Sequence, residues 1–204
     1  MDFLAELEAE AIKDNIPIIR ESVQSLLKVL IEAVRPLSIL EVGTAVGFSA
    51  ILMLESAPPD CRLTTIENYE KRIPLARENF IKSGFDKRIE LLEGDATEVL
   101  KVLREQERGY DLIFMDAAKG QYLNFFEDVM GLLNCGGLLI SDNALQDGDI
   151  IESRFAVRRR DRTIHSRMRE YLYILMHDKR LQTTILPIGD GITVSVYKKD
   201  NNTE

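Results

Sequence analysis

Apolar runs alternate with amphipathic stretches along most of the chain. Five short runs of mainly apolar residues predict buried strands at residues 38–42, 62–67, 88–94, 110–116 and 136–142. Each of the first four is followed by a predicted helix, at residues 48–57, 69–84, 95–106 and 121–133. Continuous apolar strands separated by helices indicate an α/β fold, with a mostly parallel sheet that is covered by helices on both faces.

The two ends of the chain complete this picture. Residues 181–188 and 191–198 flank the turn Gly189-Asp190-Gly191, which predicts a C-terminal antiparallel hairpin. We expect a helical region at residues 1–35 and another at 149–179, where residues 149 to 179 contain neither Gly nor Pro. A chain of 204 residues suits one domain, which we expect to span residues 1–200.

Composition excludes several classes of protein. No apolar run approaches the roughly 20 residues of a membrane-spanning helix, and the acidic start "MDFLAELEAEAIKD" lacks the features of a signal peptide. Cys61 and Cys135 form no CxxC pair and the chain has only two histidines, which disfavours a disulfide framework or a zinc centre. We therefore expect a cytoplasmic protein without a membrane partner.

The predicted strand ends carry residues suited to an adenosine-containing cofactor. Gly43 and Gly47 follow the first strand as GxxxG, which fits a single carboxylate, such as the methionine end of S-adenosylmethionine, better than a dinucleotide. A tight turn is the alternative role for these glycines. Glu67 ends the second strand, where its carboxylate can accept hydrogen bonds from both ribose hydroxyls. After the third strand, Asp95 either caps a helix or lies near the adenine ring.

The next two strand ends carry residues suited to catalysis. Asp116 ends the fourth strand, and Asp142 and Asn143 follow the fifth. Oxygen ligands from adjacent strand ends suit a hard cation such as Mg²⁺, which lowers the pKa of a bound substrate hydroxyl. Lys119 is placed to accept the proton of that hydroxyl as a general base. A turn or helix cap is the alternative role for Asp142 and Asn143, and a surface charge is the alternative for Lys119.

A family resemblance connects these features. The segments "ILEVGTAVGFSAILM", "TTIENYEKR", "DLIFMDAAKGQYLNFF", "LLISDNAL" and "LPIGDGITVS" resemble the metal-dependent O-methyltransferases related to catechol and caffeoyl-CoA O-methyltransferases, over residues 16–198. The resemblance implies a Rossmann-like fold with a seven-stranded sheet, S-adenosylmethionine as methyl donor, and Mg²⁺ or Mn²⁺. It places the metal ligands on Asp116, Asp142 and Asn143 and the catalytic lysine on Lys119. It places the cofactor contacts on Ile19, Glu41, Gly43, Ser49, Glu67, Ala96 and Asp116.

Charge is distributed unevenly along the chain. The net charge is −8, yet residues 154–169 contain seven arginines opposed only by Asp161. A solvated helix face is one explanation. The other is an RNA-binding edge, because arginine pairs with phosphate and stacks on bases. We expect the RNA contacts on Arg154, Arg158, Arg159, Arg160, Arg162 and Arg167.

Two substrate classes follow from this charge pattern and the resemblance. The chain is most similar to the bacterial tRNA 5-hydroxyuridine methyltransferases within the family, through "MDAAKGQYLNFF" and the arginine-rich stretch. We therefore expect tRNA as the partner, with methylation of a wobble 5-hydroxyuridine in the anticodon loop to give 5-methoxyuridine. The alternative is a small catechol or caffeoyl-CoA-like acceptor. A binding module without catalysis is disfavoured because Lys119 and all three metal ligands are present. The resemblance also implies a homodimer.

Overall fold

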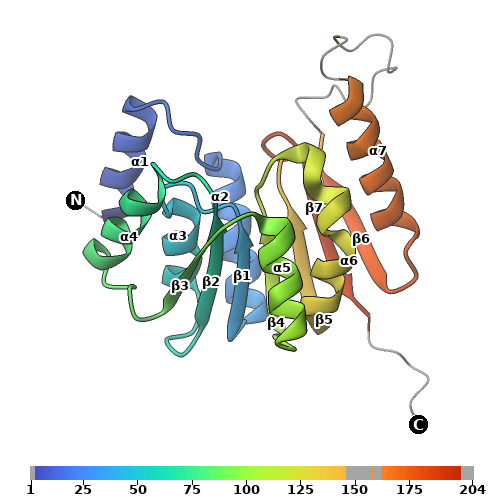
Figure 1. Ribbon diagram of the computed structural model, residues 1–204, viewed down its shortest axis with the longest axis horizontal. Helices are drawn as coiled ribbons and strands as arrows, with labels where there is room; N and C mark the ends of the chain where they lie inside the picture. The colour runs from blue at the N-terminus through green and yellow to red at the C-terminus, as the bar shows by residue number, and fades with distance from the viewer. Residues whose placement is uncertain (1–2, 146–157, 159–161, 199–204) are drawn as a thin grey trace. The chain divides into compact units, whose positions relative to one another are not determined.

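The computed structural model describes residues 3–145, 158 and 162–198. The backbone divides into two compact units, residues 1–99 and 100–204. Each unit is an α/β structure with its own strands and helices, which Figure 1 labels. None of the described helices is long and apolar enough to cross a membrane.

The first unit holds three parallel strands in the order β3-β2-β1. Register pairs β1 with β2 from Ser38↔Arg62 to Val42↔Ile66 and continues from β2 to β3, where Glu67 pairs with Glu93. The elements are α1 (Phe3–Lys13), α2 (Glu21–Val34), β1 (Ser38–Val42), α3 (Phe48–Ser56), β2 (Arg62–Glu67), α4 (Ile73–Lys82) and β3 (Ile89–Glu93); α5 (Ala96–Glu105) spans the boundary between the units.

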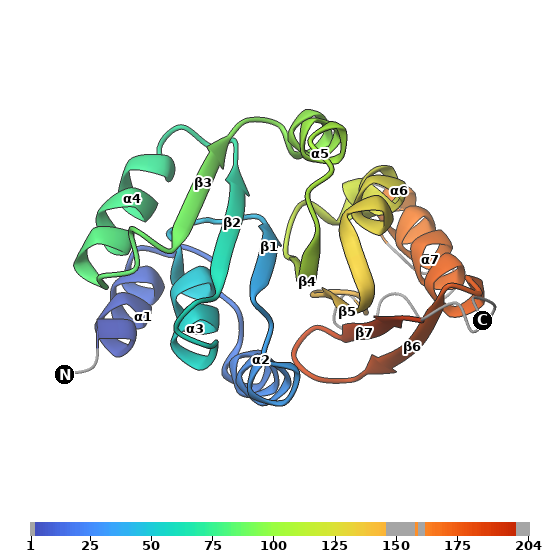
Figure 2. The same cartoon turned by 90° about the horizontal axis from the view of Figure 1, so that it is seen from below.

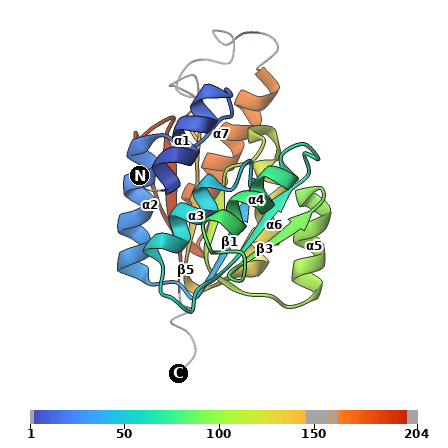
Figure 3. The ribbon, with the colours of Figure 1, turned by 90° about the vertical axis from the view of Figure 1, so that its left-hand side faces the viewer.

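Helices α2, α3 and α4 lie on one face of these strands (Figures 2 and 3). Helix α3 contacts both α1 and α2 as well as β2. Its sequence is apolar on nearly every side, and residues 48 to 54 are all buried, as expected for a helix enclosed by neighbours. This burial fixes the position of the loop between β1 and α3, which contains the glycines singled out above.

The second unit has strand order β4-β5-β7-β6. Strands β4 and β5 are parallel, whereas β7 pairs antiparallel with both β5 and β6. Helices α6 and α7 lie on the same face of these strands (Figure 2). The elements are β4 (Tyr110–Met115), the 3-10 turn η1 (Lys119–Gln121), α6 (Tyr122–Leu132), β5 (Leu133–Ser141), α7 (Arg162–His177), β6 (Leu181–Leu186) and β7 (Ile192–Tyr197).

These strands and helices confirm the predicted fold class, an α/β Rossmann-like fold with a seven-stranded, mostly parallel sheet and a C-terminal antiparallel hairpin. Two elements begin three or four residues from the predicted start, whereas most of the others differ by only one or two residues at an end. Helix α4 begins at Ile73 rather than residue 69, because Pro74 is tolerated only in the first turn of a helix. Strand β5 begins at Leu133, where pairing with Tyr110 continues across an irregularity in register. Most of the first part of the predicted helical region 149–179 lies outside the described residues, and α7 forms residues 162–177 of it.

Candidate functional site

The loop between β1 and α3 is held by hydrogen bonds at each of its five residues. The N–H of Gly43 donates to the Ile66 carbonyl at 3.1 Å, and the N–H of Gly47 donates to the Thr44 carbonyl at 2.8 Å. Gly43 and Gly47 have φ values of 107° and 85°, in the left-handed region that favours glycine. The remaining contacts are Thr44 with Thr65, Ala45 with Glu67, and Val46 with Asn79. The loop is therefore pre-formed, as a rigid cofactor cradle requires.

A buried carboxylate and three hydroxyl groups also hold this loop in place. Glu41 is fully buried, and its carboxylate accepts hydrogen bonds from Ser49 at 2.5 Å and from Thr65 at 2.6 Å. The Thr65 hydroxyl has one hydrogen, which it donates to Glu41, so the Thr44 hydroxyl must donate to Thr65 across the 2.6 Å contact. The structure thus brings together Glu41 and Ser49, two predicted cofactor contacts, and adds Thr44 and Thr65, which the sequence did not reveal.

Glu67 links the end of β2 to the same loop. Its Oε2 accepts the N–H of Ala45 at 2.8 Å, while Oε1 accepts the N–H groups of Asn68 and Tyr69 at 3.0 and 2.9 Å. Ala45 has a φ of 48°, a strained value for a residue other than glycine. Because a carboxylate has about four acceptor sites, the three backbone contacts leave one for a ribose hydroxyl, on Oε2.

The other predicted cofactor contacts lie at two further positions in the first unit. Asp95 caps α5, because its Oδ1 accepts the N–H of Thr97 at 2.8 Å. This is the structural alternative considered above, and Ala96 follows as the first residue of that helix. Ile19 is buried before α2, and its carbonyl accepts a hydrogen bond from Gln24 at 3.0 Å. The cofactor roles of these residues stay predictions.

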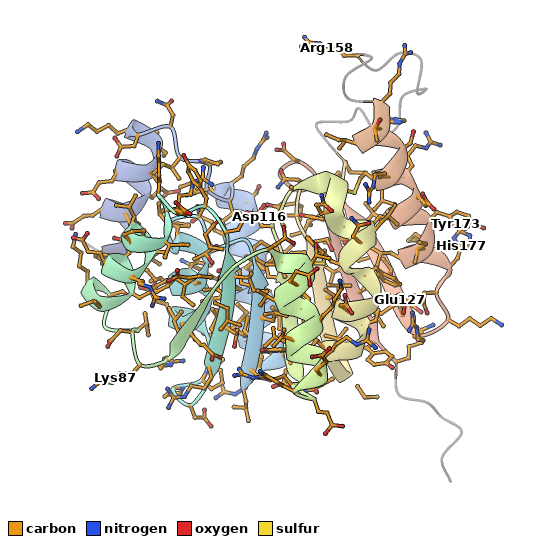
Figure 4. The ribbon with its side chains drawn as sticks, viewed as in Figure 1. Lys87, Asp116, Glu127, Arg158, Tyr173 and His177 are labelled. Atoms are coloured by element: carbon orange, nitrogen blue, oxygen red, sulfur yellow. The ribbon has the colours of Figure 1, made fainter. Side chains whose placement is uncertain are left out.

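In the second unit, the predicted metal ligands lie at the ends of β4 and β5. The Nδ2 of Asn143 lies 3.1 Å from Oδ1 of Asp116, and Figure 4 labels Asp116. Asp142 is buried, and its Oδ1 accepts the N–H of Asn143 at 2.7 Å. Asn143 has a φ of 58°, which asparagine tolerates better than most residues. The hairpin turn supports the chain just beyond, since the Ala144 N–H donates to the Gly191 carbonyl at 2.7 Å.

Tyr122, which the sequence reasoning did not single out, contacts the backbone at these ligands. It is fully buried at the start of α6, and its hydroxyl contacts the carbonyls of Met115 and Asp142 at 3.0 and 3.2 Å. Burial raises the pKa of Tyr122 well above its ordinary value, and the negative charges of Asp116 and Asp142 raise it further. Tyr122 is therefore a neutral hydrogen-bond donor over the physiological pH range.

Lys119 is the first residue of the 3-10 turn η1 and follows the predicted ligand Asp116 by three positions. Its role as general base stays a prediction. Among the arginines, Arg158 is exposed (Figure 4). Arg162 and Arg167 lie on α7, where Arg167 donates to Oδ1 of Asn124 at 2.6 Å. Arg154, Arg159 and Arg160 lie outside the described residues.

The donor set at the β4 and β5 ends suits a divalent cation. Two carboxylates and one carboxamide supply oxygen ligands of the kind that Mg²⁺ and Mn²⁺ prefer. Asn143 already contacts Asp116, and a half-turn of its amide would present the oxygen in place of the nitrogen. No cluster of three or more His, Cys, Asp or Glu side chains that could hold a metal is found among the described residues. A site here therefore depends on the asparagine as its third ligand.

A Rossmann-like sheet with a pre-formed glycine loop after β1 and an acidic residue at the end of β2 defines an α/β protein that binds an adenosine-containing cofactor. Comparison with known sequences gives the family. The sequence model of the O-methyltransferase family matches residues 1–198. The chain belongs to this family and is an S-adenosylmethionine-dependent O-methyltransferase.

Individual relatives support this assignment. A caffeoyl-CoA O-methyltransferase from Medicago sativa is 31% identical over 176 residues, covering 82% of this chain and 70% of the relative. The O-methyltransferase from Bacillus cereus, solved in complex with S-adenosylhomocysteine, has a TM-score of 0.86 and 25% identity, covering 97% of this chain and 91% of that one. The S-adenosylhomocysteine-bound Podospora anserina methyltransferase PaMTH1 has a TM-score of 0.86 and 28% identity, covering 98% and 89%.

Proposed function

We propose that the chain transfers the methyl group of S-adenosylmethionine to a hydroxyl of a small catechol or caffeoyl-CoA-like acceptor, with a divalent cation held by Asp116, Asp142 and Asn143. The observation that carries the proposal is the contact across the ends of β4 and β5, where the Nδ2 of Asn143 lies 3.1 Å from Oδ1 of Asp116 and the Asp142 carboxylate accepts the N–H of Asn143. The curated relative from Medicago sativa, a caffeoyl-CoA O-methyltransferase by name, favours this acceptor class.

The chemistry divides between the cation and the chain. When bound, the cation would lower the pKa of the acceptor hydroxyl and orient its oxygen. Asp116 and Asp142 supply the negative charge that holds it, and Lys119 takes the hydroxyl proton on its Nζ. The acceptor oxygen forms the new bond to the methyl carbon, and the bond from that carbon to sulfur breaks. Its electron pair stays on sulfur, which leaves S-adenosylhomocysteine on the loop of residues 43–47.

A second candidate acceptor is the wobble 5-hydroxyuridine of tRNA. It is favoured by the seven arginines of residues 154–169 within a chain of net charge −8. An acidic surface repels RNA, so a local excess of arginine restricts docking to one edge. The same reaction applies, because a 5-hydroxyuridine also presents an acidic hydroxyl beside a second oxygen.

One experiment tests the metal and both acceptors. Purified protein is incubated with methyl-labelled S-adenosylmethionine and either caffeoyl-CoA, catechol or hydroxyuridine-containing tRNA, each with Mg²⁺ or with excess chelator. We expect metal-dependent label on caffeoyl-CoA or catechol. If tRNA alone were labelled, the proposal of a small-molecule acceptor would be wrong and the RNA acceptor would take its place. Full activity in excess chelator would refute the metal site for either acceptor.

Two variants sharpen this experiment. Asp142→Asn is expected to abolish transfer, because it removes a charge from the cation site. The matched control is Asp178→Asn, just after the C-terminal end of α7, which removes an aspartate that pairs with Arg180 at 2.6 Å. This control should retain wild-type transfer. Equal losses in both variants would indicate a general loss of stability and contradict the role of Asp142.

A further inference from the structure

The Tyr122 hydroxyl lies where the backbone segments that carry the predicted metal ligands meet. Its oxygen is 3.0 Å from the carbonyl oxygen of Met115 and 3.2 Å from that of Asp142. Met115 directly precedes Asp116 in the chain, so this one side chain contacts the backbone next to one ligand and the backbone of another.

These contacts extend the pairing of two strands beyond its last register pair. Strands β4 and β5 pair in parallel as far as Met115↔Ser141. Beyond that pair, the Asp142 N–H donates to the Met115 carbonyl at 2.9 Å. The Tyr122 hydroxyl, on the first residue of α6, then shares its one hydrogen between the Met115 and Asp142 carbonyls. These bonds therefore act on the separation of the two strand ends, and with it on the separation of Asp116 from Asp142.

The ring of Tyr122 is itself held in place. Its centroid lies 5.4 Å from that of Tyr171 in an edge-to-face arrangement, and Tyr171 packs in the same way against Phe126 at 6.2 Å. Tyr122 and Tyr171 are both fully buried. The hydroxyl of Tyr171 lies 2.6 Å from the Ser141 hydroxyl, so it contacts a side chain rather than the backbone of a ligand. The Tyr171 hydroxyl also lies 3.9 Å from Sδ of Met115, so both hydroxyls contact Met115, but only that of Tyr122 contacts backbone carbonyls.

We propose that Tyr122 is a positioning residue that sets the distance between Asp116 and the Asp142-Asn143 pair, so that the three ligands close on one divalent cation. The proposal rests on the metal site of the proposed function. Mg²⁺ demands near-ideal ligand distances, and groups that orient metal ligands contribute about 10–100-fold to metal affinity. Tyr122 acts on the backbone of the ligands, and we expect about a 10-fold contribution, at the lower end of that range.

The test compares Tyr122→Phe with Tyr171→Phe. Each variant loses one fully buried hydroxyl from the same pair of packed rings. Mn²⁺ binding is measured by the electron paramagnetic resonance signal of free Mn²⁺, with S-adenosylhomocysteine present, and the free energy of unfolding is measured in urea. We expect both variants to lose stability, but only Tyr122→Phe to bind Mn²⁺ about 10-fold more weakly.

Packing and hydrogen bonding are separated by a second pair of variants. At position 122, 4-aminophenylalanine keeps a donor in the hydroxyl's place, whereas 4-methylphenylalanine fills the same volume without one. The amino variant should bind Mn²⁺ more tightly than the methyl variant. This pair also serves if Tyr122→Phe does not fold.

The outcomes are distinct. Wild-type protein that takes up no Mn²⁺ would overturn the metal site together with this inference. Wild-type Mn²⁺ binding that persists unchanged in Tyr122→Phe would overturn the inference alone. Equal weakening in Tyr122→Phe and Tyr171→Phe, or equal affinities of the amino and methyl variants, would assign Tyr122 to general packing and would also overturn it.

Discussion

Glu67 offers the sharpest test of the cofactor site, because the structure limits what its carboxylate can still accept. Three backbone N–H groups, those of Ala45, Asn68 and Tyr69, already donate to it. The sequence predicts that it accepts hydrogen bonds from both ribose hydroxyls. The geometry leaves one acceptor site, on Oε2. We therefore expect Glu67 to hold one ribose hydroxyl, not two.

The expected loss of cofactor affinity in Glu67→Ala follows from the kind of hydrogen bond that is removed. A hydrogen bond to a charged group contributes about 1.5–3 kcal/mol, which corresponds to about a 10- to 150-fold loss of cofactor affinity in Glu67→Ala. The same substitution removes the acceptor of the Ala45 N–H, whose left-handed backbone is already unfavourable by about 1–2 kcal/mol. Part of any loss therefore comes from the loop rather than from the ribose.

A set of ligands separates the two contributions. Calorimetry compares S-adenosylhomocysteine with its 2′-deoxy and 3′-deoxy analogues, on wild type and on Glu67→Ala. Wild type should bind both analogues more weakly than S-adenosylhomocysteine. The variant should bind one of the analogues as tightly as S-adenosylhomocysteine, because the partner of the missing hydroxyl is gone. Loop disorder alone would lower all three affinities by the same factor. If Glu67→Ala removed the affinity difference for both analogues, or for neither, the inference that Glu67 holds one ribose hydroxyl would be refuted.

Glu93 is the matched control. It pairs with Glu67 in the register of β2 and β3, but its side chain is 51% exposed and forms a surface ion pair with Arg77. Surface pairs contribute little to stability. Glu93→Ala should therefore bind all three ligands with the same preferences as wild type.

Three further predictions concern catalysis and the cofactor loop. Lys119→Ala should lose roughly 10²–10⁴ in rate, and the loss should shrink as pH rises in a pH–rate profile, because the acceptor hydroxyl then ionises unaided; an equal loss at every pH would contradict a general base. Gly47→Ala should unfold in urea more easily than Gly84→Ala: both glycines have similar positive φ values of 85° and 76°, but a Cβ at 47 overlaps Phe80 whereas one at 84 meets open space. Equal losses would contradict that packing. Thr65→Val should destabilise the chain by about 1–3 kcal/mol because it leaves the buried Glu41 carboxylate short of a donor, and Thr65→Ser should restore it; Thr64→Val, at a part-buried hydroxyl 3.3 Å from Glu90, is the control and should cost less.

Local patterns in the sequence predicted much of the fold. Strands such as residues 38–42 and 62–67 have the predicted boundaries because apolar and β-branched residues make up most of each, and turn-forming residues such as Gly43 and Asp60 lie just outside them. The Gly189-Asp190-Gly191 turn correctly predicted the hairpin of β6 and β7. Where one local signal opposed another, the boundary moved: Pro74 delayed α4, and Gly136 did not begin β5 but lies within it.

Sequence reasoning could not find the residues that hold the site from below. Thr65 and Tyr122 lie within segments that carry the family resemblance, but neither they nor Asn79 were assigned a role. Their roles depend on partners 21 to 33 positions away or on backbone carbonyls, which periodicity and residue type do not reveal. Asp95 illustrates the opposite case, since its two candidate roles were both visible in the sequence and the structure shows the helix cap directly.

The cofactor loop and the predicted metal site share one physical device. In each, a carboxylate accepts the N–H of a non-glycine residue whose φ is positive: Glu67 holds Ala45, and Asp142 holds Asn143. Such backbone is strained and persists only where its surroundings impose it. The acidic residues expected to bind a ligand therefore also shape the loop on which that ligand depends. Because the two roles coincide, the binding free energy lost on removing either carboxylate exceeds the energy of its ligand contact. A second ligand or a matched variant is needed to separate the contribution of that contact from the contribution of the loop.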